Sequence, residues 1–162
     1  MILYHGSNVV VDKPALIPQN RYLDFGFGFY TTTNQQQAIG FADKVTKRRK
    51  DGCKTVSTYE INEIKAFAKC SVLRFDEPNE AWLDFVSANR SGSYTGQHYD
   101  FIYGPVANDD VYTTFTLYSA GVLTKEQTLE ALKIKNLYNQ LVLTTEKAIS
   151  YLTFTGTLSM ED

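Results

Sequence analysis

The sequence predicts an α+β domain, and three features lead to this fold class. Strand-like segments lie at both ends of the chain and bracket several helical segments, without the regular strand–helix alternation of parallel α/β proteins. The 162 residues suffice for one domain with its own core, and no Pro/Ser-rich linker divides them. Fractions of 43% hydrophobic and 21% charged residues are typical of globular proteins. We therefore expect a single domain covering residues 1–162.

The first half of the chain predicts three strands around one long helix. "MILYHG" is typical of a strand that ends in a turn at Gly6–Ser7. A helix is expected to begin after Asn34, whose side chain can cap it, and to end near Lys50–Gly52. The residues expected to share its buried face are Ala38, Phe41, Ala42 and Val45. Two further strands are expected at residues 55–61 and 70–75.

The second half predicts four helices and two strands. Pro78 and Asn79 open a helix with Trp82 on its apolar face. "YDFIYGPVA" indicates a short buried strand broken at Gly104–Pro105, and Asn108 is expected to cap the next helix. Thr124 and Gln127 have the spacing of a capping box. A strand, "NQLVLTT", and a closing helix, "TEKAISYL", complete the expectation.

Composition excludes several classes of function. A net charge of -2 gives no bulk attraction to nucleic acid or anionic membrane. One basic cluster stands out, formed by Lys44, Lys47, Arg48, Arg49 and Lys50. We favour a solvated helix end, where cations suit the helix dipole, while a compact RNA, DNA or tRNA site stays open.

Cysteine usage and hydropathy point to a reduced, non-membrane environment. Cys53 and Cys70 show no CxxC spacing, so neither a disulfide framework nor a metal site is expected. No apolar stretch approaches the roughly 18 residues needed to span a bilayer. The first residues lack the basic start and long apolar run of a secretion signal. We therefore expect a cytoplasmic protein.

Three short segments carry polar or aromatic groups that an ordinary core does not need. In "LYHGS", His5 ends a strand and Gly6 follows it. In "FGFGFYTTT", glycines at alternate strand positions imply a bend, a bulge or a close approach, just before Tyr30. In "YNQLVL", Gln140 begins a strand, where a buried amide needs partners. Taken singly, each segment has a structural explanation: a satisfied histidine, a twisted edge strand, and an amide bonded to a loop.

In this order the three segments resemble the His-Tyr-Glu signature of diphtheria-toxin-like ADP-ribosyltransferases, the class that contains the poly-ADP-ribose polymerases. Those enzymes carry a His-Gly-Ser or His-Gly-Thr turn, a Phe-Gly-x-Gly-x-Tyr strand and a late Asn-Glu-Tyr strand. The whole chain is similar to the bacterial family of unknown function DUF3990, which is regarded as ADP-ribosyltransferase-like and often toxin-like. The resemblance implies two small antiparallel sheets that form a split β-core with peripheral helices, and NAD in the cleft between them.

The resemblance also implies residue roles. His5 would bind the ribose of the adenosine half of NAD, Gly6 would hold the nicotinamide carboxamide through its backbone, and Tyr30 would stack on the nicotinamide ring. Phe41 would complete an aromatic sandwich. The implied catalytic residues are His5, Tyr30 and Gln140. The implied NAD-binding residues are His5, Gly6, Ser7, Gly28, Tyr30, Thr32 and Phe41.

The sequence departs from the class at two of its positions. Gln140 replaces the glutamate, so it supplies no negative charge and cannot act as a base; single transfer is favoured over chain elongation. Ala38 replaces a serine that donates to the carboxamide, a role that Thr32 could assume. Other acids considered as the source of charge are Asp100, Asp109 and Glu146. Candidate partners of the NAD pyrophosphate are Arg21 and Arg90.

Together these features predict an NAD-dependent mono-ADP-ribosyltransferase that cleaves the nicotinamide–ribose bond and transfers ADP-ribose to a protein or a nucleic acid. Family resemblance adds the expectation of a bacterial toxin restrained by a small antitoxin protein. Two alternatives stay open. One is an NAD-binding module that has lost turnover through Gln140, and the other is an NAD glycohydrolase, in which water is the acceptor.

Overall fold

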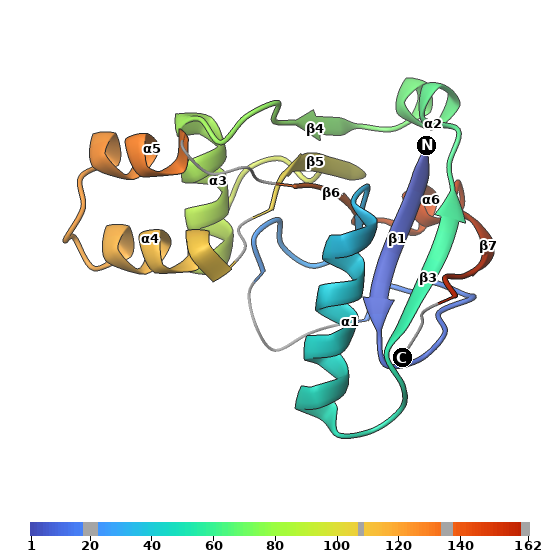
Figure 1. The fold of residues 1–162 in the computed structure, drawn as a ribbon. Helices are drawn as coiled ribbons and strands as arrows, with labels where there is room; N and C mark the ends of the chain where they lie inside the picture. The colour runs from blue at the N-terminus through green and yellow to red at the C-terminus, as the bar shows by residue number, and fades with distance from the viewer. Residues whose placement is uncertain (18–22, 107–108, 134–137, 160–162) are drawn as a thin grey trace.

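A single sheet with helices packed on it forms the framework of the protein (Figure 1). The computed structural model describes residues 1–17, 23–106, 109–133 and 138–159. The strands of these residues are β1 (Ile2–Ser7), β2 (Phe29–Thr32), β3 (Thr55–Glu60), β4 (Val72–Arg74), β5 (Phe101–Pro105), β6 (Asn139–Leu143) and β7 (Thr153–Thr157). The helices are α1 (Gln35–Arg49), α2 (Glu63–Lys69), α3 (Glu80–Arg90), α4 (Asp109–Ser119), α5 (Lys125–Lys133) and α6 (Glu146–Ile149). None of the helices in these ranges has the length and apolar content to cross a bilayer.

The strands are arranged in the order β4-β5-β6-β2-β1-β3-β7, which confirms the α+β class. All neighbours are antiparallel except β4 and β5, which are parallel. The described strands form one 7-stranded sheet, whereas two sheets were expected. The two expected parts of the sheet are joined where β1 meets β2, and these two strands pair only at Tyr4 and Thr32. A sheet in two halves, β4-β5-β6-β2 and β1-β3-β7, is thus held continuous by a single residue pair.

Helix α1 lies along β1 and β3, while α3, α4 and α5 lie beside the other half of the sheet (Figure 1) and share a hydrophobic cluster with β5 and β6. The buried face of α1 consists of Ala38, Ala42 and Val45, whose small side chains let the helix approach the sheet closely. Phe41, expected on this face, is instead 47% exposed. The largest side chain in the core under α3 is the fully buried Trp82, which meets Phe115 of α4 edge to face.

Helix starts follow the local signals in the sequence. The Asn34 side chain accepts a hydrogen bond from the Gln37 amide at 2.8 Å, and that of Asn79 accepts one from the Trp82 amide at 3.0 Å. The capping box is also present: the Thr124 amide donates to Gln127 Oε1, and the Gln127 amide donates to Thr124 Oγ1. The expected cap Asn108 lies outside the described residues.

Several elements differ from expectation. The strand containing the glycines begins only at Phe29, because Gly26 adopts a φ of 81° in a turn. Strand β5 runs through Gly104 and Pro105 to its pairing with Asn139. The expected closing helix is limited to α6, and β7 follows it as an edge strand on β3. Helix α2 was not expected; it is capped by the side chain of Asn62.

Candidate functional site

The three segments singled out in the sequence lie on three neighbouring strands, β1, β2 and β6. Thr32 on β2 is paired with Tyr4 on one side and with Gln140 on the other. His5 follows Tyr4, and Tyr30 lies on the same strand as Thr32. Segments far apart in the chain are therefore brought together at the joint between the two halves of the sheet.

His5 spans this joint with its side chain. Its Nδ1 atom lies 2.6 Å from the carbonyl oxygen of Tyr30. Because a carbonyl oxygen only accepts, Nδ1 carries the hydrogen, and Nε2 of the neutral ring presents a lone pair. Burial lowers the pKa of His5, against the opposing effect of the Tyr30 hydrogen bond. The ring stacks on Phe29 with centroids 4.4 Å apart. His5 is thus held as a neutral imidazole with an acceptor at Nε2.

Tyr30 holds the turn that precedes its strand. Its hydroxyl donates to the carbonyl oxygen of Gly26 at 2.6 Å and accepts from the amide of Phe25 at 3.0 Å. Burial raises the pKa of the phenol. The ring packs against the hydrophobic cluster beneath α3. Tyr30 is therefore a structural anchor, and its expected stacking role stays a prediction.

The glycines of the two motifs are explained by packing within the protein. A Cβ at Gly6 would lie 2.2 Å from the carbonyl oxygen of Ala38, so the absence of a side chain makes room for α1. A Cβ at Gly28 would lie 2.7 Å from Val142 Cγ1 and 2.8 Å from the carbonyl oxygen of Leu143, on β6. Both positions need glycine whether or not a ligand approaches them.

Gln140 carries the most conspicuous polar group of the region. The residue is 6% exposed, and its Nε2 atom has no hydrogen-bond partner among the described residues. Its side chain lies on the same face of the sheet as those of its partner Thr32 and of Val142, two positions along. A buried amide without a partner costs about 1–3 kcal/mol. Such a group is a natural place for a ligand atom that accepts a hydrogen bond.

Two hydroxyls of the expected NAD-binding set are already engaged within the protein. Thr32 Oγ1 lies 2.7 Å from Gln37 Oε1 and 3.0 Å from the carbonyl oxygen of Asn139, and it accepts from the Asn34 amide. Its single proton is thus used in holding the start of α1 to β2 and β6. The buried hydroxyl of Ser7 donates to Asn8 Oδ1 at 3.4 Å.

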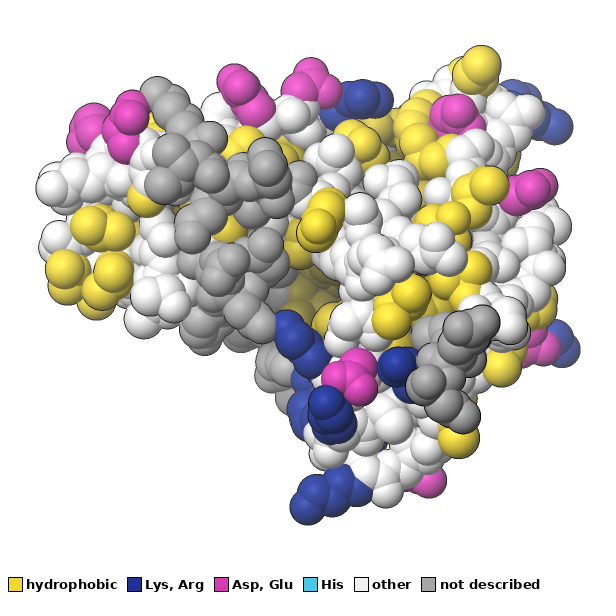
Figure 2. Space-filling model, viewed as in Figure 1, with side chains coloured by type: hydrophobic (Ala, Val, Ile, Leu, Met, Phe, Trp, Pro, Cys, Tyr) yellow, Lys and Arg dark blue, Asp and Glu magenta, His cyan; other side chains and the backbone are white. Residues whose placement is uncertain are grey.

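The exposed ring of Phe41 lies on α1, one turn beyond Gln37, whose side chain contacts Thr32 on β2. This flank of the helix therefore lies next to Thr32 and its strand partner Gln140. Figure 2 shows a recess with hydrophobic side chains near the middle of the view. Gln37 was not identified from the sequence; its position one turn before Phe41 was the available signal.

Two of the charged candidates, Asp100 and Arg90, have structural partners. Asp100 accepts hydrogen bonds from the Ser71 amide and hydroxyl and from the Thr145 hydroxyl, which lower the pKa of its carboxyl. Glu146 is exposed in the first turn of α6. Arg90 forms an ion pair with Asp24 at 2.5 Å, next to the turn that Tyr30 holds. Arg21 and the side chain of Asp109 lie outside the described residues. Asp24 was not identified from the sequence; it directly precedes the turn at Phe25 and Gly26.

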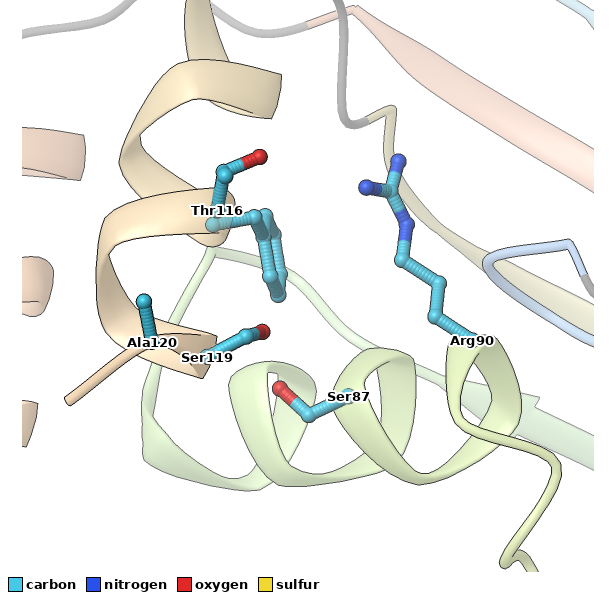
Figure 3. Close-up of a pocket in the computed structure, with 6 residues that line it drawn as sticks. Ser87, Arg90, Thr116, Ser119 and Ala120 are labelled. Carbon is cyan, nitrogen blue, oxygen red and sulfur yellow. The ribbon is translucent and has the colours of Figure 1, made fainter.

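Two cavities lie outside the three segments singled out in the sequence. One of about 390 Å³ lies between α3 and α4 and includes Ser87, Arg90 and Thr116 (Figure 3). The other, of about 680 Å³, is lined by the start of β1 and the residues around α2. Neither is lined by His5, Tyr30 or Gln140.

Comparisons with known proteins identify the family of this chain but not its chemistry. Neither the curated proteins nor the solved structures give a match to this chain. A family model described as "Protein of unknown function (DUF3990)" matches residues 1–154. Because the match covers nearly the whole chain, and as its motifs predicted, the protein belongs to the DUF3990 family.

Proposed function

We propose that this protein is an NAD-dependent mono-ADP-ribosyltransferase that transfers a single ADP-ribose group to a macromolecule. The observation that carries the proposal is the placement of the three motifs on adjacent strands, with Thr32 paired to both Tyr4 and Gln140. In the proposed reaction the bond between nicotinamide and ribose breaks, and a nucleophile of the acceptor forms a new bond to that ribose carbon.

His5 supports the proposal through its protonation state. A neutral imidazole whose Nδ1 is occupied by Tyr30 offers Nε2 to a hydroxyl group. A ribose hydroxyl of NAD is a donor of this kind. Phe41, at 47% exposure on the neighbouring flank of α1, is available to stack on a flat ring.

In the proposed reaction, Gln140 determines whether the transition state is stabilised by a negative charge. Positive charge builds on the ribose as nicotinamide leaves, and a carboxylate would stabilise it electrostatically. The amide of Gln140 is neutral, so it orients a hydroxyl without this stabilisation. Its Nε2, which has no partner among the described residues, donates to a ribose oxygen, and this fits single transfer to an acceptor that is itself a good nucleophile.

A second candidate function is an NAD-binding module without turnover. Two observations favour it: the neutral Gln140 stands where the class has a glutamate, and both oxygens of Asp100 accept hydrogen bonds from Ser71 or Thr145. Hydrolysis of NAD differs from transfer only in having water as acceptor.

Nicotinamide release and NAD binding by the purified protein separate these functions. We expect binding together with nicotinamide release and labelling of a lysate fraction. Binding with no release would favour the module, and release without any labelled macromolecule would favour the glycohydrolase.

His5→Asn is the sharpest variant, because asparagine keeps a donor near the Nδ1 position and removes Nε2. Loss of release in a folded His5→Asn protein supports the assigned role, and full activity contradicts it.

Gln140→Glu tests the charge argument directly. If charge limits the reaction, the carboxylate accelerates nicotinamide release; if the amide is adapted to a particular acceptor, release slows. Equal rates in both proteins would mean that position 140 does not contact the ribose.

The proposed biological role is that of a bacterial toxin, acting in the cytoplasm and restrained by a small antitoxin protein. This part rests on the family resemblance of the motifs. Induced expression in bacteria is expected to arrest growth, and His5→Asn is expected to relieve the arrest. Arrest that persists in the variant would contradict a toxicity caused by ADP-ribosylation.

A further inference from the structure

The side chain of Gln37 turns towards β2 instead of towards the cap of its own helix. Helix α1 begins after the cap Asn34, whose side chain accepts from the Gln37 amide. In α5 the glutamine at the same helical position, Gln127, accepts a hydrogen bond from the amide of its cap Thr124 at 2.9 Å. In α1 the cap amide donates to Thr32 Oγ1 at 3.0 Å, and Thr32 Oγ1 donates to Gln37 Oε1 at 2.7 Å. Thr32 therefore holds Gln37 beside β2.

This contact uses only the oxygen of the Gln37 amide. Its Nε2, with two hydrogens to donate, forms no hydrogen bond with any residue of the described ranges. Gln35 and Gln36, which precede it in α1, are exposed, whereas Gln37 is half-buried. The start of α1 thus fixes the position of this amide and leaves its donor nitrogen available.

Gln140 brings a second amide to the same threonine. Thr32 and Gln140 are partners across β2 and β6, so their side chains lie on one face of the sheet with Cβ atoms about 5 Å apart. Gln140 is 6% exposed, and its Nε2 also lacks a partner among the described residues. Two amide nitrogens, one from α1 and one from β6, therefore flank Thr32. Packing alone requires neither donor, and a ligand with two neighbouring acceptor oxygens would satisfy both.

We propose that Gln37 is a further ribose-binding residue, and that Gln37 and Gln140 each hold one of the two adjacent hydroxyl groups of the nicotinamide ribose. The inference rests on the proposed function, in which Gln140 contacts this ribose. Each Nε2 donates to one hydroxyl oxygen, and no covalent bond changes in this step. Two hydroxyls on neighbouring carbons fit two amides on neighbouring elements, because each oxygen accepts a separate hydrogen bond.

The test measures affinity for carbocyclic NAD by calorimetric titration. In this ligand a methylene group replaces the ring oxygen of the nicotinamide ribose, so both hydroxyls are present and the bond to nicotinamide is not cleaved. Two truncated ligands each lack one of the two hydroxyls of that ribose. Nicotinamide release from NAD itself is measured separately.

The test variant is Gln37→Glu, and the matched control is Gln36→Glu. The substitution at position 37 keeps an oxygen that accepts from Thr32 and replaces only the donor nitrogen by an acceptor. The control adds the same negative charge to the first turn of α1, on the exposed neighbouring side chain. A negative charge suits the N-terminus of a helix, so both variants are expected to fold, and circular dichroism verifies this.

We expect Gln37→Glu to weaken binding of the complete ligand by about tenfold or more, because a hydrogen bond is lost and two acceptors face each other. Gln36→Glu is expected to change the affinity by less than about threefold, since solvent and salt screen an exposed charge. With one of the truncated ligands, the native protein and Gln37→Glu are expected to bind within about threefold of each other, because the hydroxyl that Gln37 holds is already absent. The other truncated ligand is expected to retain the difference.

Three results would overturn the inference: unchanged affinity in Gln37→Glu, equal losses in the two variants, or a loss in Gln37→Glu that persists with both truncated ligands. In the last two cases the substitution would act through charge or through the fold, and not on a ribose hydroxyl. If the native protein binds carbocyclic NAD and releases nicotinamide from NAD, these results refute the inference alone. A native protein that neither binds nor cleaves refutes the proposed function, and the inference with it.

Discussion

The imidazole of His5 bridges β1 and β2 just beyond their only backbone pair, because its Nδ1 donates to the carbonyl oxygen of Tyr30 at 2.6 Å. A side chain thus continues the connection where the ladder between these strands stops. The same bond fixes the tautomer of the ring, so the structural and the proposed chemical roles of His5 depend on one contact. The protonation of His5 therefore affects stability and, in the proposed function, activity as well.

We expect the free energy of unfolding to decrease as the pH falls below 6.5, the usual pKa of histidine. Burial lowers the pKa of His5 in the folded state, so the unfolded chain binds the proton first and stability falls with pH. The decrease ends once the pH passes below the folded-state pKa. Urea unfolding of the native protein and of His5→Asn between about pH 5 and pH 8 measures this contribution. The same pH dependence in both proteins would contradict it.

Replacement of Gln140 by leucine is expected to raise the free energy of unfolding by about 1 kcal/mol, because it removes a buried amide nitrogen without a partner in the described structure. NAD binding is expected to weaken in the same variant. Thermal unfolding and calorimetric titration give the two quantities. A destabilised Gln140→Leu protein would show that the amide is satisfied in solution.

Gly6→Ala is expected to destabilise the protein by about 1–3 kcal/mol or more. The new Cβ would lie 2.2 Å from the Ala38 carbonyl oxygen and 2.8 Å from the Ala42 amide nitrogen, so α1 must move away from β1. Gly40→Ala is the matched control, since a Cβ there meets no described atom within 4 Å. The control is expected to stabilise α1 by up to about 1 kcal/mol through helix propensity. Equal effects of the two substitutions, measured by thermal unfolding, would refute the close contact.

Tyr30→Phe is expected to loosen the turn at Phe25 and Gly26 while keeping the aromatic ring. The substitution leaves the Phe25 amide and the Gly26 carbonyl without their hydroxyl partner, at a cost of about 1–3 kcal/mol. Faster hydrogen exchange at the Phe25 amide is the direct measurement. Tyr138→Phe, at a position 45% exposed, is the control and is expected to change stability by less than about 0.5 kcal/mol. Unchanged exchange in Tyr30→Phe would show that other contacts hold the turn.

Local signals in the sequence predicted the helix starts, because a cap involves residues only two or three positions apart. Asn34, Asn79 and the Thr124–Gln127 pair all cap helices as expected. The apolar periodicity of α1 did not correctly predict the exposure of Phe41. The close contact of α1 with β1 at Gly6 admits only small side chains, so the buried face is narrower than the apolar pattern suggested.

Contacts between distant segments could not be read from the sequence. Gly28 was expected to admit a ligand, but the space beside it is filled by Val142, on a strand near the other end of the chain. The edge strand β7 was missed because its alternation of Thr and Phe or Gly is short and weakly hydrophobic. The resemblance to a known signature implied that the three motifs lie close together. The register of β1, β2 and β6 places them on adjacent strands. Whether they bind NAD stays a prediction.

The single pair of Tyr4 and Thr32 also sets the mechanical weak point of the molecule. Strands β1 and β3 pair along their full lengths, and β2 pairs along its full length with β6, so each half of the sheet resists being pulled apart. A load that separates β1 from β2 would meet, within the sheet, one backbone pair and the His5 bond, and beyond it the contact of Phe29 with Tyr59 and the hydrogen bond between Thr32 and Gln37. Any ligand that contacts both His5 and Gln140 would bridge the two halves, and it would therefore raise the force at which the sheet opens.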